Sequence, residues 1–330
     1  MGYRMSPVTQ TPRIKPPALQ PGDTVGIVAP ASRIKPEMLA AGCEGLRRLG
    51  YRPFYFDSIL AEETYFAGSV ERRARELEEM FVRDDVRAIV CARGGYGANY
   101  LLGVLDWMKI ERHPKIFCGY SDLTVLLTHF ADAAGFVTFH GPMVTKDFSR
   151  EDGVDLPSWE AALGGRSEWA LDFGPESGVT PLVEGSAEGI LYGGCLSLLV
   201  ASLGTPYEIQ TAGTILFLED VGEKPYQIDR MLMHLKLAGK LADVRGIVFG
   251  EMLDCMQNPE QGYTLEEVVL RLLGELGVPV AFGLRSGHVS KRNVTLPFGV
   301  RAALRVGREA SLNILEAATA AAVPARLTTS

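Results

Sequence analysis

Residues 118–123 (CGYSDL) place a serine at the point where an apolar strand pattern gives way to a helix pattern. A strand ending at Gly119 and a helix beginning after Ser121 would hold the serine on a tight turn at the carboxyl edge of a sheet. The backbone N–H of Asp122 would lie at the positive end of that helix, where it could stabilise an oxyanion. Two interpretations follow: Ser121 is a nucleophile, or it is a helix cap.

A second turn, residues 92–99 (ARGGYGAN), follows the preceding predicted strand and therefore opens at the same sheet edge. Consecutive glycines let the backbone approach a ligand closely and turn N–H groups toward it. The turn fits neither G-x-G-x-x-G nor G-x-x-x-x-G-K-S/T, and no lysine follows it, which disfavours nucleotide binding. It is either the second donor of an oxyanion hole or a glycine turn without a chemical role.

A serine nucleophile needs a general base, and the chain has five histidines. His113 falls in a charged stretch, and His129 and His234 fall within helix patterns. His140 ends a predicted strand at the same sheet edge. His288 lies in a polar loop (RSGHVSKRN) that can present either ring nitrogen. His140 and His288 are therefore both candidates on the residues alone.

A carboxylate that orients the imidazole is expected at the end of a rigid element. Glu219 directly follows an apolar strand pattern over residues 214–218, where an unpaired charge would be costly. Asp220 and Glu223 are its nearby competitors. The order Ser, Glu, His agrees with an α/β-hydrolase, but Leu123 stands where the second glycine of G-x-S-x-G would be, which disfavours that fold.

Metal and cofactor chemistry is not expected, because no H-E-x-x-H motif occurs and the histidines are scattered. The cysteines form no C-x-x-C pair, which indicates buried thiols in a reducing compartment. They are Cys43, Cys91, Cys118, Cys195 and Cys255. The N-terminal segment has no apolar stretch typical of a signal peptide, and no apolar run approaches a membrane span, so the expected location is the cytoplasm.

The composition is that of an ordinary globular protein of 330 residues, long enough for two domains. Its net charge of −7 repels nucleic acid and anionic lipid, so neither nucleic acid nor a membrane is an expected partner. From about residue 22 to 142, short β-branched runs alternate with amphipathic stretches, which predicts an α/β domain with a parallel, Rossmann- or flavodoxin-like sheet.

The predicted organisation is an N-terminal α/β domain over 19–145, a connector over 146–180, a C-terminal α+β domain over 181–316, and flexible termini over 1–18 and 317–330. Predicted strands of the first domain cover 25–29, 51–56, 88–91, 116–119 and 137–139. Helices are predicted to start near Pro36, Ser69, Ala98 and Asp122. The second domain is predicted to contain strands over 214–218, 246–249, 280–284, 294–297 and 302–306, and helices from 195, over 225–237 and over 265–276.

Together these motifs resemble the LD-carboxypeptidase family of serine peptidases, which includes the microcin C immunity hydrolases. The resemblance extends from about residue 19 to 307 and is carried by eight segments in order: PGDTVGIVAPAS, ARGGYGANYLL, CGYSDLTVLL, FHGPM, EGILYGGCLSLL, FLEDVGEKPYQIDRML, GIVFGEMLDC and GHVSKRNVTLPFGVRAAL. One departure is Cys195, in GGCLSLL, where the family often has asparagine.

The resemblance implies a role for each matching position. Ser121 would be the nucleophile, Glu219 the orienting carboxylate and His288 the general base, with the N–H groups of Gly95 and Asp122 as the oxyanion hole. The nucleophile would lie on the first domain and the other two side chains on the second. No metal or cofactor is implied, and a homodimer is expected.

The implied activity is removal of the terminal D-alanine from a murein tetrapeptide, by cutting the L-diaminopimelate or L-lysine to D-alanine bond in cytoplasmic cell-wall recycling. The substrate is thus a small peptide with a free C-terminal D-amino acid, whose carboxylate suits an arginine or lysine. The candidates for substrate contacts are Arg93, Tyr96, Cys195, Arg285, Lys291 and Arg292. The alternatives are a microcin C immunity-type hydrolase of aminoacyl- or peptidyl-nucleotide amides and a non-catalytic binder of murein peptide or nucleotide.

Overall fold

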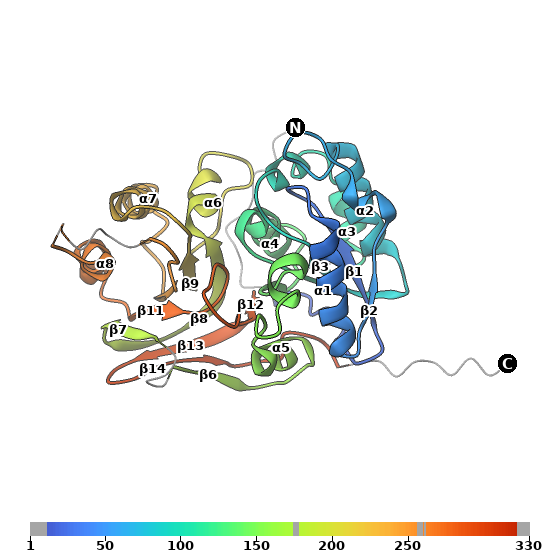
Figure 1. Cartoon of the computed structure of the whole chain (residues 1–330). Helices are drawn as coiled ribbons and strands as arrows, with labels where there is room; N and C mark the ends of the chain where they lie inside the picture. The colour runs from blue at the N-terminus through green and yellow to red at the C-terminus, as the bar shows by residue number, and fades with distance from the viewer. Residues whose placement is uncertain (1–11, 174–177, 256–259, 261, 322–330) are drawn as a thin grey trace.

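The computed structural model describes residues 12–173, 178–255, 260 and 262–321, and these form two sheets that lie side by side with helices around them (Figure 1). No helix in these ranges is both long enough and apolar enough to cross a bilayer. The mixed α/β class expected from the sequence is confirmed, with a mainly parallel first sheet and a mixed second sheet.

The first sheet has the strand order β12-β5-β4-β3-β1-β2. Its strands are β1 (Thr24–Val28), β2 (Arg52–Phe54), β3 (Val86–Cys91), β4 (Ile116–Gly119), β5 (Thr138–His140) and β12 (Leu296–Phe298). The first five are parallel, and β12 is antiparallel to β5. Because parallel strands point the same way, the turns after β3, β4 and β5 open at one edge.

Helices cover both faces of this sheet, which explains its nearly continuous apolar strands. Successive residues of β3 point to opposite cores: Ala88 and Val90 pack with α1 (Pro36–Arg48), and Ile89 and Cys91 pack with α2 (Val70–Val82). The remaining helical elements of this half are α3 (Trp107–Glu111), α4 (Thr124–Asp132), α5 (Leu156–Leu163) and the short turns η1 (Asp57–Leu60), η2 (Ala98–Leu101), η3 (Ser121–Leu123) and η4 (Val144–Phe148).

The second sheet has the order β6-β14-β13-β8-β9-β10-β11-β7, in which β8 to β11 are parallel. Its strands are β6 (Trp169–Phe173), β7 (Thr180–Val183), β8 (Gly185–Cys195), β9 (Thr214–Glu219), β10 (Gly246–Gly250), β11 (Val280–Leu284), β13 (Arg301–Val306) and β14 (Ala310–Ile314). Its helical elements are α6 (Leu196–Ala201), α7 (Pro225–Leu237), α8 (Leu265–Leu273) and η6 (Gly274–Leu276).

A single apolar core joins the two sheets. Ile215 and Phe217 of β9 and Val248 of β10 belong to the same buried cluster as Val25 and Ala88 of the first sheet. The other face of the second sheet packs on α6, α7 and α8. The carboxyl edges of β4 and β9 can therefore be held in a fixed relation, because both strands are anchored in shared apolar packing.

Several boundaries differ from the expected organisation. The expected connector 146–180 carries α5 and β6, and the segment expected as a strand over 294–297 is β12, which returns to the first sheet. Parts of both expected tails belong to the fold, because Ala18 and Ala320 are joined by a backbone hydrogen bond of 3.0 Å. Residues 1–11 and 322–330 of those tails lie outside the described residues.

Candidate active site

Ser121 stands on a strained turn directly after β4. Its φ is +64°, a left-handed backbone conformation that a residue with a side chain rarely adopts. The helix α4 starts only at Thr124 and has no side-chain cap, and among the described residues the Ser121 hydroxyl has no hydrogen-bond partner. The capping interpretation is therefore wrong. Such strain is typical of functional positions, where it aims a side chain.

The glycine turn after β3 packs directly on this serine. A Cβ at Gly94 would lie 2.7 Å from Ser121 Cβ and 2.9 Å from its Oγ, so only glycine fits there. The Asp122 carboxylate accepts a hydrogen bond of 2.7 Å from the N–H of Ala98, at the far end of the same turn. Burial raises the pKa of Asp122 to about 6, although hydrogen bonds from Ala98 and Gly97 oppose that shift.

Two backbone N–H groups at this junction are free. Within the part of the chain that the structure describes, neither Gly95 nor Asp122 donates its backbone N–H to a protein acceptor. Gly95 has φ +99°, and a Cβ there would lie 2.3 Å from Ser32 Oγ. Two unused donors beside a strained serine have the composition of an oxyanion hole.

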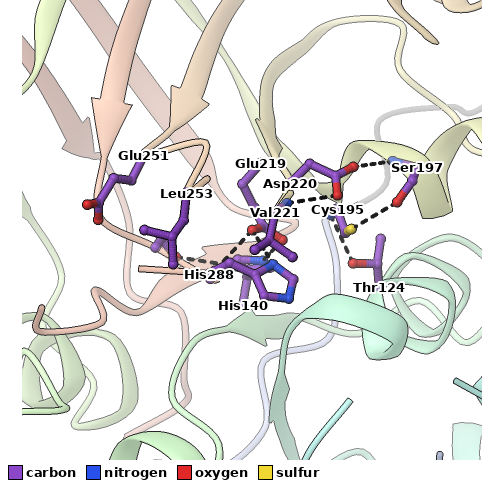
Figure 2. A network of polar contacts seen from close by, with 12 residues as sticks. Thr124, His140, Cys195, Ser197, Glu219, Asp220, Val221, Glu251, Leu253 and His288 are labelled. Atoms are coloured by element: carbon purple, nitrogen blue, oxygen red, sulfur yellow. Dashed lines mark hydrogen bonds and ion pairs between the residues drawn. The ribbon is translucent and has the colours of Figure 1, made fainter. Parts of the chain in front are cut away.

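Glu219 is the last residue of β9 and is fully buried. Two glycines give it room: a Cβ at Gly250 would lie 2.5 Å from Glu219 Cβ, and a Cβ at Gly287 would lie 2.6 Å from Glu219 Cδ. Its neighbour Asp220 is directed elsewhere, since its carboxylate accepts from the N–H of Ser197 at 2.8 Å and thereby serves the start of α6 (Figure 2). A buried carboxylate needs partners of its own.

His288, in the loop after β11, supplies two donors to one oxygen of Glu219. Its backbone N lies 3.0 Å and its Nδ1 2.8 Å from Glu219 Oε2. Because a carboxylate only accepts, Nδ1 carries the proton and Nε2 is the ring nitrogen left to act as a base. Burial by itself raises the pKa of Glu219, but the facing imidazoles of His288 and His140 outweigh it and hold that pKa well below its usual range.

Sequence reasoning missed the residue that fixes the histidine loop. The side chain of Asn293 is fully buried and grips Gly287 from both sides: its Oδ1 accepts from the Gly287 N–H at 3.0 Å, and its Nδ2 donates to the Gly287 carbonyl at 3.1 Å. These two hydrogen bonds fix the position of Gly287, the residue just before His288. No pattern in the sequence distinguishes Asn293 from an ordinary loop asparagine.

The candidate base His288 and the candidate nucleophile Ser121 follow strands of different sheets, and the residue that relates them is Tyr120. The ring of His288 lies 5.2 Å from the ring of Tyr120, the residue before Ser121. Within the described residues no hydrogen bond joins Ser121 to His288, and the contact that relates them is the one between the rings of His288 and Tyr120. Catalytic hydrogen bonds often shorten only when substrate is bound.

His140, the other histidine candidate, faces the same carboxylate from the first sheet. It is fully buried, and its Nε2 lies 3.7 Å from Glu219 Oε1, the oxygen that His288 does not use (Figure 2). It therefore has no access to a substrate. The two histidines, both open as candidates on the residues alone, differ in access: the side chain of His288 is 12% exposed, whereas that of His140 is 0% exposed.

The candidates for substrate contacts fall into separate places. Arg93 and Tyr96 are exposed on the glycine turn, where Arg93 Nη1 donates to the carbonyl of Arg33 at 3.3 Å. Arg285 and Lys291 line another cavity of about 810 Å³, together with Arg292. Cys195, at the end of β8 next to Glu219, is buried, and burial raises the pKa of its thiol well above the ordinary value.

No group of three or more potential metal-ligating side chains occurs among the residues that the structure describes. The chemistry available at the junction is that of a hydroxyl, an imidazole, a carboxylate and two amide donors. This combination is suited to acyl transfer through a serine nucleophile.

Comparisons with known proteins give one family. Family models described as the LD-carboxypeptidase N-terminal domain and the LD-carboxypeptidase C-terminal domain match residues 25–141 and 188–304. The chain is 40% identical over 302 residues to a Bacillus subtilis protein named "Probable murein peptide carboxypeptidase", covering 90% of this chain and 93% of the relative.

Solved structures agree with this match. The muramoyltetrapeptide carboxypeptidase of Oxalobacter formigenes is 31% identical, with a TM-score of 0.79, covering 89% of this chain and 99% of the other. MccF in complex with glutamyl sulfamoyl guanosine shares the fold, with a TM-score of 0.85 at 24% identity, covering 93% of this chain and 100% of that one.

Proposed function

Because this chain belongs to the LD-carboxypeptidase family and is thereby a carboxypeptidase, we propose that it is a serine enzyme that releases D-alanine from murein tetrapeptide. The bond cut is the one between the L-centre of diaminopimelate or lysine and the terminal D-alanine. The observation that carries the proposal is the pairing of His288 Nδ1 with the buried Glu219, which leaves Nε2 free to act as a base, in a ring whose centroid lies 5.2 Å from that of Tyr120, the residue before the strained Ser121. The names of the relatives support the substrate class.

In the first half of the reaction, Ser121 Oγ attacks the carbonyl carbon of the penultimate residue while His288 Nε2 takes the hydroxyl proton. The oxyanion that forms accepts hydrogen bonds from the N–H groups of Gly95 and Asp122. When the C–N bond breaks, His288 returns the proton to the leaving amine of D-alanine. The product of this half is an ester between Ser121 and the shortened peptide.

In the second half, water replaces the amine. His288 Nε2 removes a proton from water as its oxygen attacks the ester carbonyl, and the same proton returns to Ser121 Oγ when the ester bond breaks. Glu219 stays ionised throughout and stabilises the imidazolium, which its depressed pKa permits. The peptide lacking D-alanine leaves with a new carboxylate.

A carboxypeptidase must also recognise the free carboxylate one residue beyond the cut bond. Arg93 is an exposed cation beside the glycine turn, since its Nη2 lies 3.5 Å from the position that a Cβ of Gly95 would take. We assign it to the D-alanine carboxylate, because a guanidinium can bind a carboxylate through two parallel bonds. A cytoplasmic location and a homodimer are part of the same proposal and follow the family resemblance.

A second function is favoured by one observation: the fold is shared with MccF, which has been solved in complex with glutamyl sulfamoyl guanosine. The same Ser121 chemistry would cut the amide of such a compound. The remaining alternative, a protein that binds murein peptide or nucleotide without turnover, is disfavoured because the chain belongs to a family of carboxypeptidases.

The decisive experiment follows D-alanine release from tetrapeptide by mass spectrometry, with wild type, Ser121→Ala and His288→Ala. Release by the wild type and its loss in both variants supports the proposal, and a matched peptide ending in L-alanine tests the D-preference. Glutamyl sulfamoyl guanosine at equal enzyme concentration tests the second function. Labelling of Ser121 by a serine-directed phosphonate argues against pure binding, whereas turnover that survives Ser121→Ala contradicts the assigned nucleophile.

A further inference from the structure

The second oxygen of Glu219 has one polar group in front of it, and that group is His140. Glu219 Oε1 is buried, and among the described residues it has no hydrogen-bond partner. His140 Nε2 is likewise buried without a hydrogen-bond partner, and the two atoms lie 3.7 Å apart, both side chains being 0% exposed. Two orphaned polar atoms that face each other are unusual in a protein interior, where nearly all such atoms are satisfied.

The surroundings leave His140 no alternative on that side. Its ring is enclosed by Phe217 at 5.1 Å, Phe298 at 5.4 Å and Tyr120 at 6.0 Å. The charged or titratable groups facing it are Glu219 from β9, His288 from the loop after β11 and the phenol of Tyr120 after β4. An unscreened carboxylate oxygen in such an apolar cage interacts strongly with whatever Nε2 presents, a proton or a lone pair.

The hydrogen bond of the other ring nitrogen, Nδ1, determines whether Nε2 presents a proton or a lone pair. His140 Nδ1 lies 2.9 Å from Ser286 Oγ, and Ser286 Oγ lies 2.8 Å from the carbonyl oxygen of Val294. The single hydroxyl proton of Ser286 can go to only one of them. If it goes to Val294 and the ring is neutral, Nδ1 carries the ring proton, and Nε2 turns a lone pair toward Glu219.

A neutral ring protonated on Nδ1 places the lone pair of Nε2 against a buried carboxylate. This repulsion costs more free energy than the loss of the hydrogen bond from Ser286 to the carbonyl of Val294. In the two other arrangements Nε2 is protonated: either Ser286 donates to Nδ1 of a neutral ring, or the ring carries both protons. We propose that His140 is a positioning residue that keeps a proton on Nε2 and directs it at Glu219 Oε1. His140 is then a fourth side chain of the set formed by Ser121, His288 and Glu219. This inference rests on the proposed function for its kinetic consequences only.

The arrangement gives Glu219 one imidazole on each oxygen. His288 comes from the second sheet and His140 from β5 of the first, so the carboxylate is held from both halves of the molecule. Gly287 lies between them, with a hypothetical Cβ 2.7 Å from Glu219 Oε2 and 2.8 Å from His140 Cε1. Loss of the rear contact would let the carboxylate turn and would misalign His288, and a displacement of about 1 Å in a catalytic group can cost about 100-fold in rate.

The first test reads the protonation of His140 directly in the wild-type chain. With histidine labelled in ¹⁵N, the ring nitrogens of five histidines are observed, and the His140 signals are assigned by their loss in His140→Gln. A proton on Nε2, with or without one on Nδ1, supports the inference. A ring protonated on Nδ1 alone overturns it. This result does not depend on any substrate, so it stays separate from a failure of the proposed function.

The second test uses two amides of similar chemistry but different reach. In His140→Gln the amide nitrogen can occupy the place of Nε2 and face Glu219, whereas in His140→Asn it can occupy the place of Nδ1 and face Ser286. We expect kcat for D-alanine release to fall at least tenfold further in His140→Asn than in His140→Gln, with KM nearly unchanged because His140 cannot touch substrate. The control is His129→Asn, in a partly buried histidine that packs on Trp107 and is not part of the site.

If His140 has a purely structural role, kcat is not expected to be lower in His140→Asn than in His140→Gln. Equal kcat values for the two variants, or a lower value in His140→Gln, overturn the inference. The melting temperature of each variant is measured beside the kinetics, so that a loss of folded protein is not counted as a loss of kcat. If the wild type itself releases no D-alanine, the proposed function fails while the ¹⁵N result remains readable.

Discussion

His288 grips Glu219 through two atoms of the same residue, its backbone N at 3.0 Å and its Nδ1 at 2.8 Å from one carboxylate oxygen. The backbone bond fixes the position of the residue, and the ring bond fixes its orientation and tautomer. A single buried oxygen therefore determines both the position of the His288 ring and which of its nitrogens is free.

Glu219→Gln tests this relationship. An amide of nearly the same shape keeps the volume but removes the charge that stabilises the imidazolium and selects the tautomer. We expect kcat to fall by roughly 10³- to 10⁴-fold, as for the equivalent change in a serine protease triad. Steady-state release of D-alanine measures this. Loss of less than tenfold would mean that the carboxylate does not orient the base.

Ser121 combines a strained backbone conformation with the hydroxyl that is proposed as the nucleophile. Its φ of +64° suits glycine, so Ser121→Gly is expected to be more stable than Ser121→Ala by about 0.5–1 kcal/mol, while both variants lose turnover. Urea unfolding of the two variants beside the wild type measures the difference. If Ser121→Ala is instead the more stable variant by about 0.5–1 kcal/mol, which is the ordinary advantage of alanine over glycine, the turn stores no backbone strain. Residual turnover above about 10⁻³ of wild type would mean that another group attacks the substrate.

Gly94→Ala should disable the site by steric contact alone. The new Cβ would lie 2.7 Å from Ser121 Cβ, too close for either residue to keep its place, so we expect kcat to fall at least about 100-fold. The matched control is Gly103→Ala, where a Cβ meets nothing within 4 Å. Phosphonate labelling of Ser121 gives a second reading, and an unchanged labelling rate in Gly94→Ala would contradict the close packing of the two turns.

Asn293→Ala removes the grip on Gly287. The N–H and carbonyl of Gly287 are left buried without partners, so we expect a loss of about 3 kcal/mol in unfolding free energy together with a fall in kcat. Asn313→Ala serves as the control, because its side chain makes one long bond of 3.4 Å and is only partly buried. If the two substitutions cost the same stability, the histidine loop is not held by Asn293.

The parts of the site that follow from local pattern were predictable from the sequence. Ser121, the glycine turn and Glu219 each stand at the end of an apolar strand, and the rule that parallel strands share a carboxyl edge was enough to group the first two. The ranges 116–119, 225–237 and 280–284 coincide with β4, α7 and β11. The choice of histidine was not predictable from residues alone, because both rings face Glu219.

Contacts between segments that are distant in the chain could not be predicted from the sequence. β12 has the length and apolar character of a strand but no feature that selects a partner, and it pairs with β5 about 156 positions earlier, Leu296 opposite His140. The grip of Asn293 depends on loop conformation, and the loop reads as an ordinary polar turn. In both cases the outcome is set by tertiary packing, which overrides local preference.

The last prediction concerns Asp132, where three distant segments meet. Its carboxylate accepts from Arg13 at 3.0 Å and from the hydroxyl of Tyr192 at 2.6 Å, joining the segment before β1, the end of α4 and β8. Burial raises the pKa of Asp132 to about 6, because it outweighs Arg13 and the hydrogen bonds. The folded protein therefore holds this proton at pH values where the unfolded chain, with an ordinary pKa of 3.8, has lost it.

The unfolding free energy therefore depends on pH through Asp132. A group whose folded pKa is raised favours folding below its unfolded pKa, and this contribution declines as pH rises from about 4 to about 6, by at most about 3 kcal/mol. Asp132→Asn cannot titrate, so its unfolding free energy should fall less than that of the wild type across this window. Urea unfolding of both proteins at pH 4.5 and 7 provides the comparison, and only the difference between the two pH values is used, because the substitution also weakens the Arg13 contact. A variant whose unfolding free energy changes with pH as much as that of the wild type would show that Arg13 keeps Asp132 ionised in the folded state at both pH values.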